Sequence, residues 1–81
     1  MVKLRNINRD NRRIWCDYYP ESEKEAGMVV VDLNTGDLLE SKSTEFEQKL
    51  GTLAYARYAA LKLNQIKWQD VLPEKASYVW Y

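Results

Sequence analysis

Apolar residues alternate with polar ones over roughly the first half of this 81-residue chain and recur at helical spacing over the second half. Alternation has the two-residue period of a half-buried strand, whereas the later spacing has the 3.6-residue period of an amphipathic helix. The change of period falls at Thr44, and Pro20, Gly27 and Gly36 divide the earlier part into short runs. Strands followed by a helix predict an α+β fold.

Four short runs have strand character. The first two, 2–5 and 12–19, flank an Asn-Arg-Asp-Asn turn and form the predicted first hairpin. The third run, 28–33, concentrates β-branched residues, and the fourth, 37–40, follows an Asn-Thr-Gly turn at 34–36. We therefore predict a four-stranded antiparallel meander sheet with the strands in chain order.

A capping box marks the start of the helix. Thr44 and Glu47 have the spacing at which each side chain accepts a hydrogen bond from the other residue's backbone N–H. The helical pattern runs from about Glu45 to about Gln65, and Gly51 inside it costs about 1 kcal/mol relative to alanine. These features predict one long helix packed on one face of the sheet.

The C-terminal end has the composition of a strand. Pro73 stops the helical pattern, and residues 76–81 are rich in β-branched and aromatic side chains. We expect a short fifth strand there. No composition shift marks a domain boundary, so residues 1–81 are predicted to form a single small α+β domain.

Two apolar stripes run side by side along the predicted helix. Together they span an arc of roughly 260°, whereas a surface helix usually needs an apolar stripe of little more than about 100°. We expect the first stripe to pack on the sheet; it consists of Phe46, Leu50, Leu53, Arg57, Ala60 and Leu61. The second stripe includes Tyr55, Ala56, Ala59, Leu63 and Ile66.

The surplus apolar surface predicts a non-enzymatic module that binds a protein partner or a second copy of itself. Its interface would combine the second stripe with the C-terminal aromatic residues, because aromatic side chains are favoured at interfaces. The alternative is that the C-terminal segment folds back over the second stripe. The predicted interface consists of Tyr55, Ala56, Ala59, Leu63, Ile66, Tyr78 and Trp80.

A second functional hypothesis rests on the basic N-terminal hairpin. The formal net charge is zero, but residues 1–16 carry five cations and one acid, while residues 17–47 carry two cations and nine acids. Cations interleaved with aromatic rings are typical of single-stranded nucleic-acid binding. The predicted contacts of this alternative are Arg9, Arg12, Arg13, Trp15 and Tyr19.

The composition argues against most catalytic chemistry. The chain has no histidine, which removes imidazole bases and Cys/His zinc sites, and its one cysteine, Cys16, is predicted to face the core. A metal-dependent hydrolase would need Asp17, Asp32 and Glu40 to converge. We predict no enzyme, no cofactor and no metal. Arg57, in the first stripe, predicts either an ion pair with one of these carboxylates or a side chain that reaches the rim.

Nothing in the sequence predicts a membrane or secretory location. Charged residues interrupt the first nine positions, and no apolar run approaches the roughly 20 residues that span a bilayer. With a single cysteine no internal disulfide forms, which fits a reducing compartment. We expect a soluble cytoplasmic protein without a membrane partner.

Overall fold

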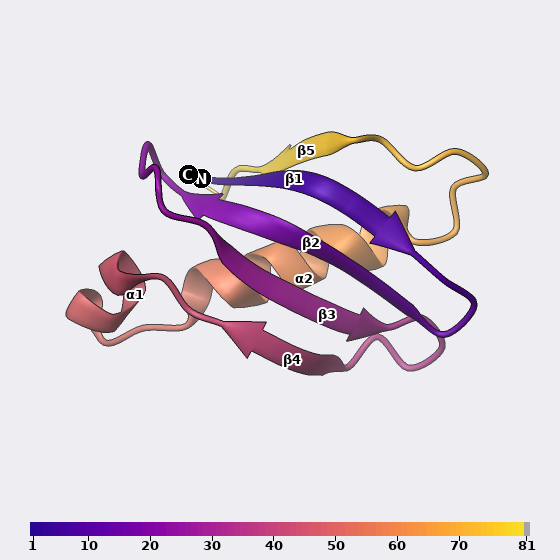
Figure 1. Ribbon diagram of the computed structural model, residues 1–81, viewed down its shortest axis with the longest axis horizontal. Helices are drawn as coiled ribbons and strands as arrows, with labels where there is room; N and C mark the ends of the chain where they lie inside the picture. The colour runs from indigo at the N-terminus through magenta and orange to yellow at the C-terminus, as the bar shows by residue number, and fades with distance from the viewer. Residues whose placement is uncertain (81) are drawn as a thin grey trace.

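A five-stranded antiparallel sheet is the central element of the computed structural model, which describes residues 1–80 (Figure 1). The strands are β1 (Val2–Arg9), β2 (Arg13–Pro20), β3 (Gly27–Asp32), β4 (Leu38–Lys42) and β5 (Lys75–Tyr78). Their order across the sheet is β4-β3-β2-β1-β5. The predicted α+β meander with a short fifth strand is confirmed. Tyr81, in the predicted last strand, lies outside the described residues.

The prediction of one long helix is wrong. The segment forms two helices, α1 (Glu45–Leu50) and α2 (Ala54–Ile66). Gly51 ends α1 in the left-handed conformation, with φ +68°, and its N–H donates to the Gln48 carbonyl. Glycine adopts this conformation without a steric penalty, so it acts as a helix stop rather than an internal cost.

The break changes which side of the helix meets the sheet. Helix α2 covers one face of the sheet with Ala56, Ala59, Leu63 and Ile66. This is the second stripe, not the first, and its alanines let the helix axis approach the strands closely. Of the first stripe only Ala60 is buried. The exposed residues of that stripe are Leu50, Leu53, Arg57 and Leu61.

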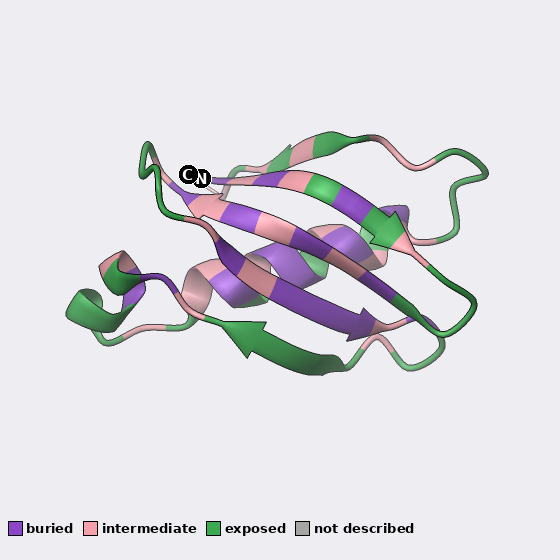
Figure 2. Ribbon diagram, viewed as in Figure 1, coloured by how far each residue is buried: buried purple, intermediate pink, exposed green. Residues whose placement is uncertain are grey.

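The other face of the sheet carries no helix, and we call it the open face. Figure 2 shows the alternation of buried and half-buried residues along β2 that results. In β1 a bulge at Asn6, with φ 56°, shifts the register between Arg5 and Asn8. As a result Ile7 joins the core on the helix side, and Arg9 also turns toward that side.

The far flank of α2 is covered by the C-terminal segment. Strand β5 pairs with β1, which brings Tyr78 and Trp80 beside the helix. Tyr58 stacks on both rings, with centroid distances of 5.4 Å to Tyr78 and 4.1 Å to Trp80, and Tyr55 meets Trp80 edge to face at 5.4 Å. The C-terminal segment therefore reaches the second stripe at Tyr55, whereas the sheet covers Ala56, Ala59, Leu63 and Ile66 of that stripe.

A buried polar cluster joins the two helices to the sheet. The side chain of Glu47 is fully buried and accepts from Tyr18 Oη at 2.5 Å, from Thr44 Oγ1 at 3.2 Å, and from the Ala56 N–H at 3.2 Å. The predicted capping box with Thr44 is present. The Tyr18 ring lies over Gly27, where an added Cβ would stand 2.3 Å from a ring carbon. The cluster holds β2, β3, α1 and the start of α2 together.

Candidate functional site

The structure places the predicted protein interface inside the fold. Ala56, Ala59, Leu63 and Ile66 lie against the sheet of their own chain, so they are not accessible to a partner. The other three residues, Tyr55, Tyr78 and Trp80, pack together and against the core. The exposed apolar residues of the molecule are therefore not those of the predicted interface.

Five leucines of β4 and the two-helix segment are exposed. They lie on β4, at the junction of the two helices and on the outer side of α2, and 40–58% of each is accessible: Leu38, Leu39, Leu50, Leu53 and Leu61. The Nδ2 of Asn64 donates to the Gly36 carbonyl in the β3–β4 turn, which directs this flank of α2 toward β4. Leu50, Leu53 and Leu61 were identified from the sequence but assigned to the core.

Strand β4 is an edge strand, and it borders these leucines. Among the strands of residues 1–80 it pairs only with β3, and all five of its residues are exposed, as the uniform colour of β4 in Figure 2 shows. Its outer N–H and C=O groups are a template for pairing with another strand. Glu40 and Lys42 point to the open face, because they pair with Val30 and Met28.

The predicted nucleic-acid residues do not share one surface. Arg9 points to the helix side, where Nη1 donates to the Lys67 carbonyl at 2.7 Å and Nη2 donates to the Asp70 carbonyl at 3.2 Å. Arg12 and Arg13 lie at the hairpin turn, where both backbone N–H groups donate to Asp10. These two bonds lower the pKa of Asp10 below its ordinary value. Arg9 is therefore a tether for the segment that follows α2.

Replacing Arg9 by alanine is expected to loosen that segment. The substitution removes two charge-assisted hydrogen bonds, and we expect a loss of about 1–2 kcal/mol of stability because the α2–β5 connection remains attached at both ends. Hydrogen exchange should accelerate in residues 67–74 while β2 and β3 stay protected. Arg12→Ala is the matched control, since its side chain is exposed at the turn. Unchanged exchange in the Arg9 variant would contradict the tether.

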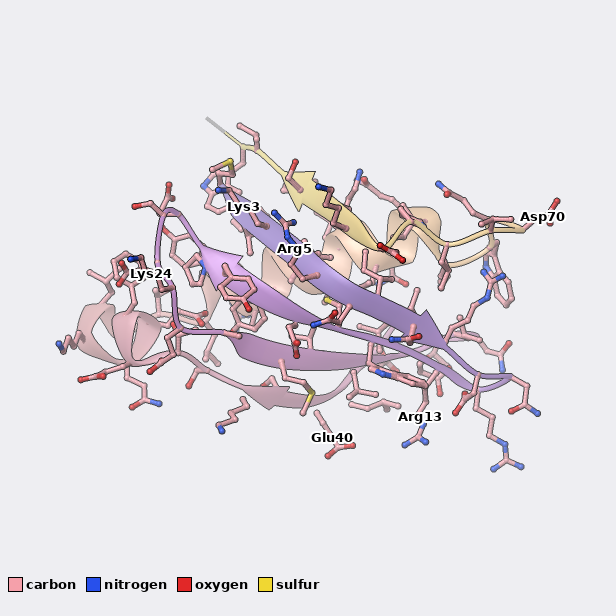
Figure 3. All side chains as sticks on the ribbon, turned by 45° about the horizontal axis from the view of Figure 1, so that its top comes forward. Lys3, Arg5, Arg13, Lys24, Glu40 and Asp70 are labelled. Atoms are coloured by element: carbon pink, nitrogen blue, oxygen red, sulfur yellow. The ribbon has the colours of Figure 1, made fainter. Side chains whose placement is uncertain are left out.

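Trp15 and Tyr19 do lie together on the open face. Lys3 and Arg5 on β1 are their neighbours, because Lys3 pairs with Tyr19 and Arg5 pairs with Asp17, which lies between the two rings on β2. On its other side Arg5 pairs with Lys75 of β5. In Figure 3 Lys3 and Arg5 lie near each other on β1, and Arg13 lies at the opposite end of the sheet. The sequence did not predict that Lys3, Arg5 and Lys75 form one group. Only the pairing of β5 with β1 brings Lys75 beside Arg5.

The thiol and the strand carboxylates form no reactive group. Burial raises the pKa of Cys16 from 9.0 to about 12, so the thiol stays protonated at neutral pH. Asp17 accepts from Asn6 Nδ2, and Asp32 accepts from the N–H groups of Thr35 and Asn34, which lower its pKa. Within residues 1–80 no three acidic or cysteine side chains come together as a metal site. Arg57 is exposed, which fits the alternative in which its side chain reaches the rim rather than a buried ion pair.

Neither helix of the described chain is long and apolar enough to span a bilayer. No family model matches the chain, and no curated protein or solved structure shows significant similarity to it.

Proposed function

We propose that the protein is a non-enzymatic interaction module that binds a second copy of itself through the edge of β4. The observation that carries the proposal is the coincidence of an unpaired strand edge with five exposed leucines. A strand edge beside apolar side chains favours strand addition, because main-chain hydrogen bonds and apolar burial are gained together.

The charges on β4 select one antiparallel register. Residues that face each other across such a pair must point to the same side of the sheet, so Glu40 can meet Glu40 or Lys42 of the second copy. Like charges directly opposite are destabilising, and opposite charges are favourable. Pairing centred on Ser41 sets Glu40 against Lys42 twice, once on each side of the two-fold axis. The self-complementarity of β4 is the argument for a second copy as the partner.

The same two-fold axis brings the leucines together. When two β4 strands pair antiparallel, the two sheets become one continuous sheet, and the helix-covered faces of both copies lie on the same side of it. Both α2 helices are then on that side. The flank of each α2 that carries Leu53 and Leu61 then faces the corresponding flank of the other. Leu38, which pairs with Val31 on the helix side of the sheet, lies beneath this contact.

Reversing one charge on β4 is expected to weaken the dimer. Glu40→Lys or Lys42→Glu turns two attractive cross-strand pairs into two repulsive ones, which corresponds to about a 30-fold rise in the dissociation constant. The double variant Glu40→Lys/Lys42→Glu restores both pairs and should restore the dimer. Light scattering at micromolar concentration measures the mass, which is 9.6 kDa for one chain and twice that for the dimer.

Two further variants sharpen the experiment. Glu23→Lys makes the same charge change in the exposed β2–β3 loop and should leave the mass unchanged. Leu61→Glu places a charge on the outer flank of α2 and should give a folded monomer. A wild-type chain that remains at 9.6 kDa, or a double variant that fails to recover the dimer, would overturn the proposal.

A further inference from the structure

Three cations lie side by side on the open face at the edge of the sheet away from β4. Arg5 of β1 is directly opposite Lys75 of β5, and Lys3 is two residues along the same face. Like charges directly opposite on neighbouring strands destabilise a sheet. None of the ion pairs within residues 1–80 involves any of the three. The fold therefore places three cations here, with Asp17 of β2 directly opposite Arg5. The cations outnumber this acid, which favours an anionic ligand.

The surface is hollowed on both sides of Lys3 and Arg5. A hollow of about 530 Å³ lies between these two residues, Tyr19 and the loop at 22–24. A second hollow, of about 310 Å³, lies between the same two residues and residues 75–77 of β5. Lys3 and Arg5 line both hollows, and we refer to the two hollows together as the groove across β1. Lys24 adds a further cation at one end of it, and Glu23 an acid.

Aromatic rings lie beside the groove on β2. Tyr19 pairs with Lys3, and Trp15 is four residues away on the same face, or roughly 13 Å along the strand. Asp17 lies between the two rings and pairs with Arg5. This acid repels phosphate from the middle of β2. Phosphates are therefore favoured over β1 and β5, with the attached bases directed toward the rings.

We propose that the open face binds single-stranded nucleic acid. The phosphates lie along Lys3, Arg5 and Lys75, and an unpaired base stacks on Tyr19, with Trp15 as the next platform. A positive groove beside aromatic rings is the arrangement by which single strands are held without sequence preference. A duplex keeps its bases stacked inside the helix, so it gains nothing from the rings. The binding site is distinct from β4 and does not depend on dimerisation.

Fluorescence anisotropy with a labelled oligo-thymidine strand tests the proposal. With three phosphates neutralised, the logarithm of the binding constant should fall against the logarithm of salt concentration with a slope of about −2. Lys3→Ala removes one contact and should reduce the slope to about −1.4. Tyr19→Ser should weaken binding about tenfold through the lost stacking while leaving the slope unchanged. Both side chains are only half-buried, so both variants should fold.

Matched controls separate this site from general charge attraction. Lys49→Ala removes the same charge from the exposed side of α1 and should change neither the affinity nor the slope. Glu23→Gln removes the acid that lines the groove and should tighten binding two- to threefold. Equal effects of Lys3→Ala and Lys49→Ala would overturn the site. Equal affinity for duplex DNA, competition by free phosphate alone, or no binding at low salt would overturn the ligand.

Discussion

Replacing Glu47 by alanine is expected to destabilise the protein by about 4 kcal/mol, which is enough to unfold much of a small domain. The substitution removes the acceptor for Tyr18 Oη and the Ala56 N–H, and it also removes the acceptor for the Thr44 N–H. Each of these donors is buried, and a buried donor without a partner costs about 1–3 kcal/mol. Urea unfolding followed by circular dichroism measures the loss.

Glu45→Ala is the matched control for this prediction. Glu45 is in the same first turn of α1, but its side chain is exposed and pairs only with Lys49, at 3.5 Å. Exposed pairs of this kind contribute a few tenths of a kcal/mol. Tyr18→Phe keeps the ring over Gly27 and should cost about 1–2 kcal/mol, less than the Glu47 variant. A Glu47→Ala protein as stable as Glu45→Ala would show that the cluster does not hold the elements together.

Local patterns in the sequence identified Glu47 as a capping residue but did not indicate which residues surround it. The spacing of Thr44 and Glu47 was sufficient to predict the capping box. A capping glutamate is usually at the surface, and nothing local indicates that Tyr18 of β2 reaches it from 29 residues away. That contact depends on Gly27, whose missing side chain leaves room for the ring. The hydrophobic period of the sequence does not indicate tertiary contacts of this kind.

The helix shows where a periodic reading fails. Continuous 3.6-residue spacing from Glu45 onward assigns Leu53 and Leu61 to the sheet, but Gly51 ends α1 and frees α2 to rotate. Glycine inside a pattern has two meanings, an internal cost or a C-cap, and only the tertiary packing decides between them. The candidate interface moved with this rotation from the second stripe of the helix to the leucines at β4.

The prediction that the basic residues of the first hairpin lie on one surface was wrong for a different reason. The sequence predicted Arg9 to lie in a turn at 8–11, but β1 continues to Arg9, and the bulge at Asn6 directs this residue to the helix side of the sheet. The signal was present, since Val2, Leu4 and Ile7 depart from a two-residue period. Lys75 had no such signal, because the pairing of β5 with β1 is a long-range contact. The strands were therefore predictable, whereas the group of cations on the open face was not.

Alkaline pH is expected to destabilise the protein through two buried groups of β2, Cys16 and Tyr18. Burial raises the pKa of Cys16 from 9.0 to about 12, and burial together with the hydrogen bond to Glu47 raises the pKa of Tyr18 above its ordinary value of 10.0. Above these ordinary values the unfolded chain releases both protons while the folded chain keeps them. The folded state then binds more protons, so its stability falls as the pH rises.

The size and order of the loss follow from the same two groups. Stability should stay level from pH 7 to about 8.5, then fall by about 1.4 kcal/mol per pH unit for each group, reaching a loss of about 4 kcal/mol near pH 11. Urea midpoints across this range measure it. Cys16→Ala removes the earlier group, so its decline should begin about one unit later, near pH 10. Cys16 is buried in β2. An equally early decline in the Cys16→Ala variant would mean that this thiol is not the group that holds the earlier proton.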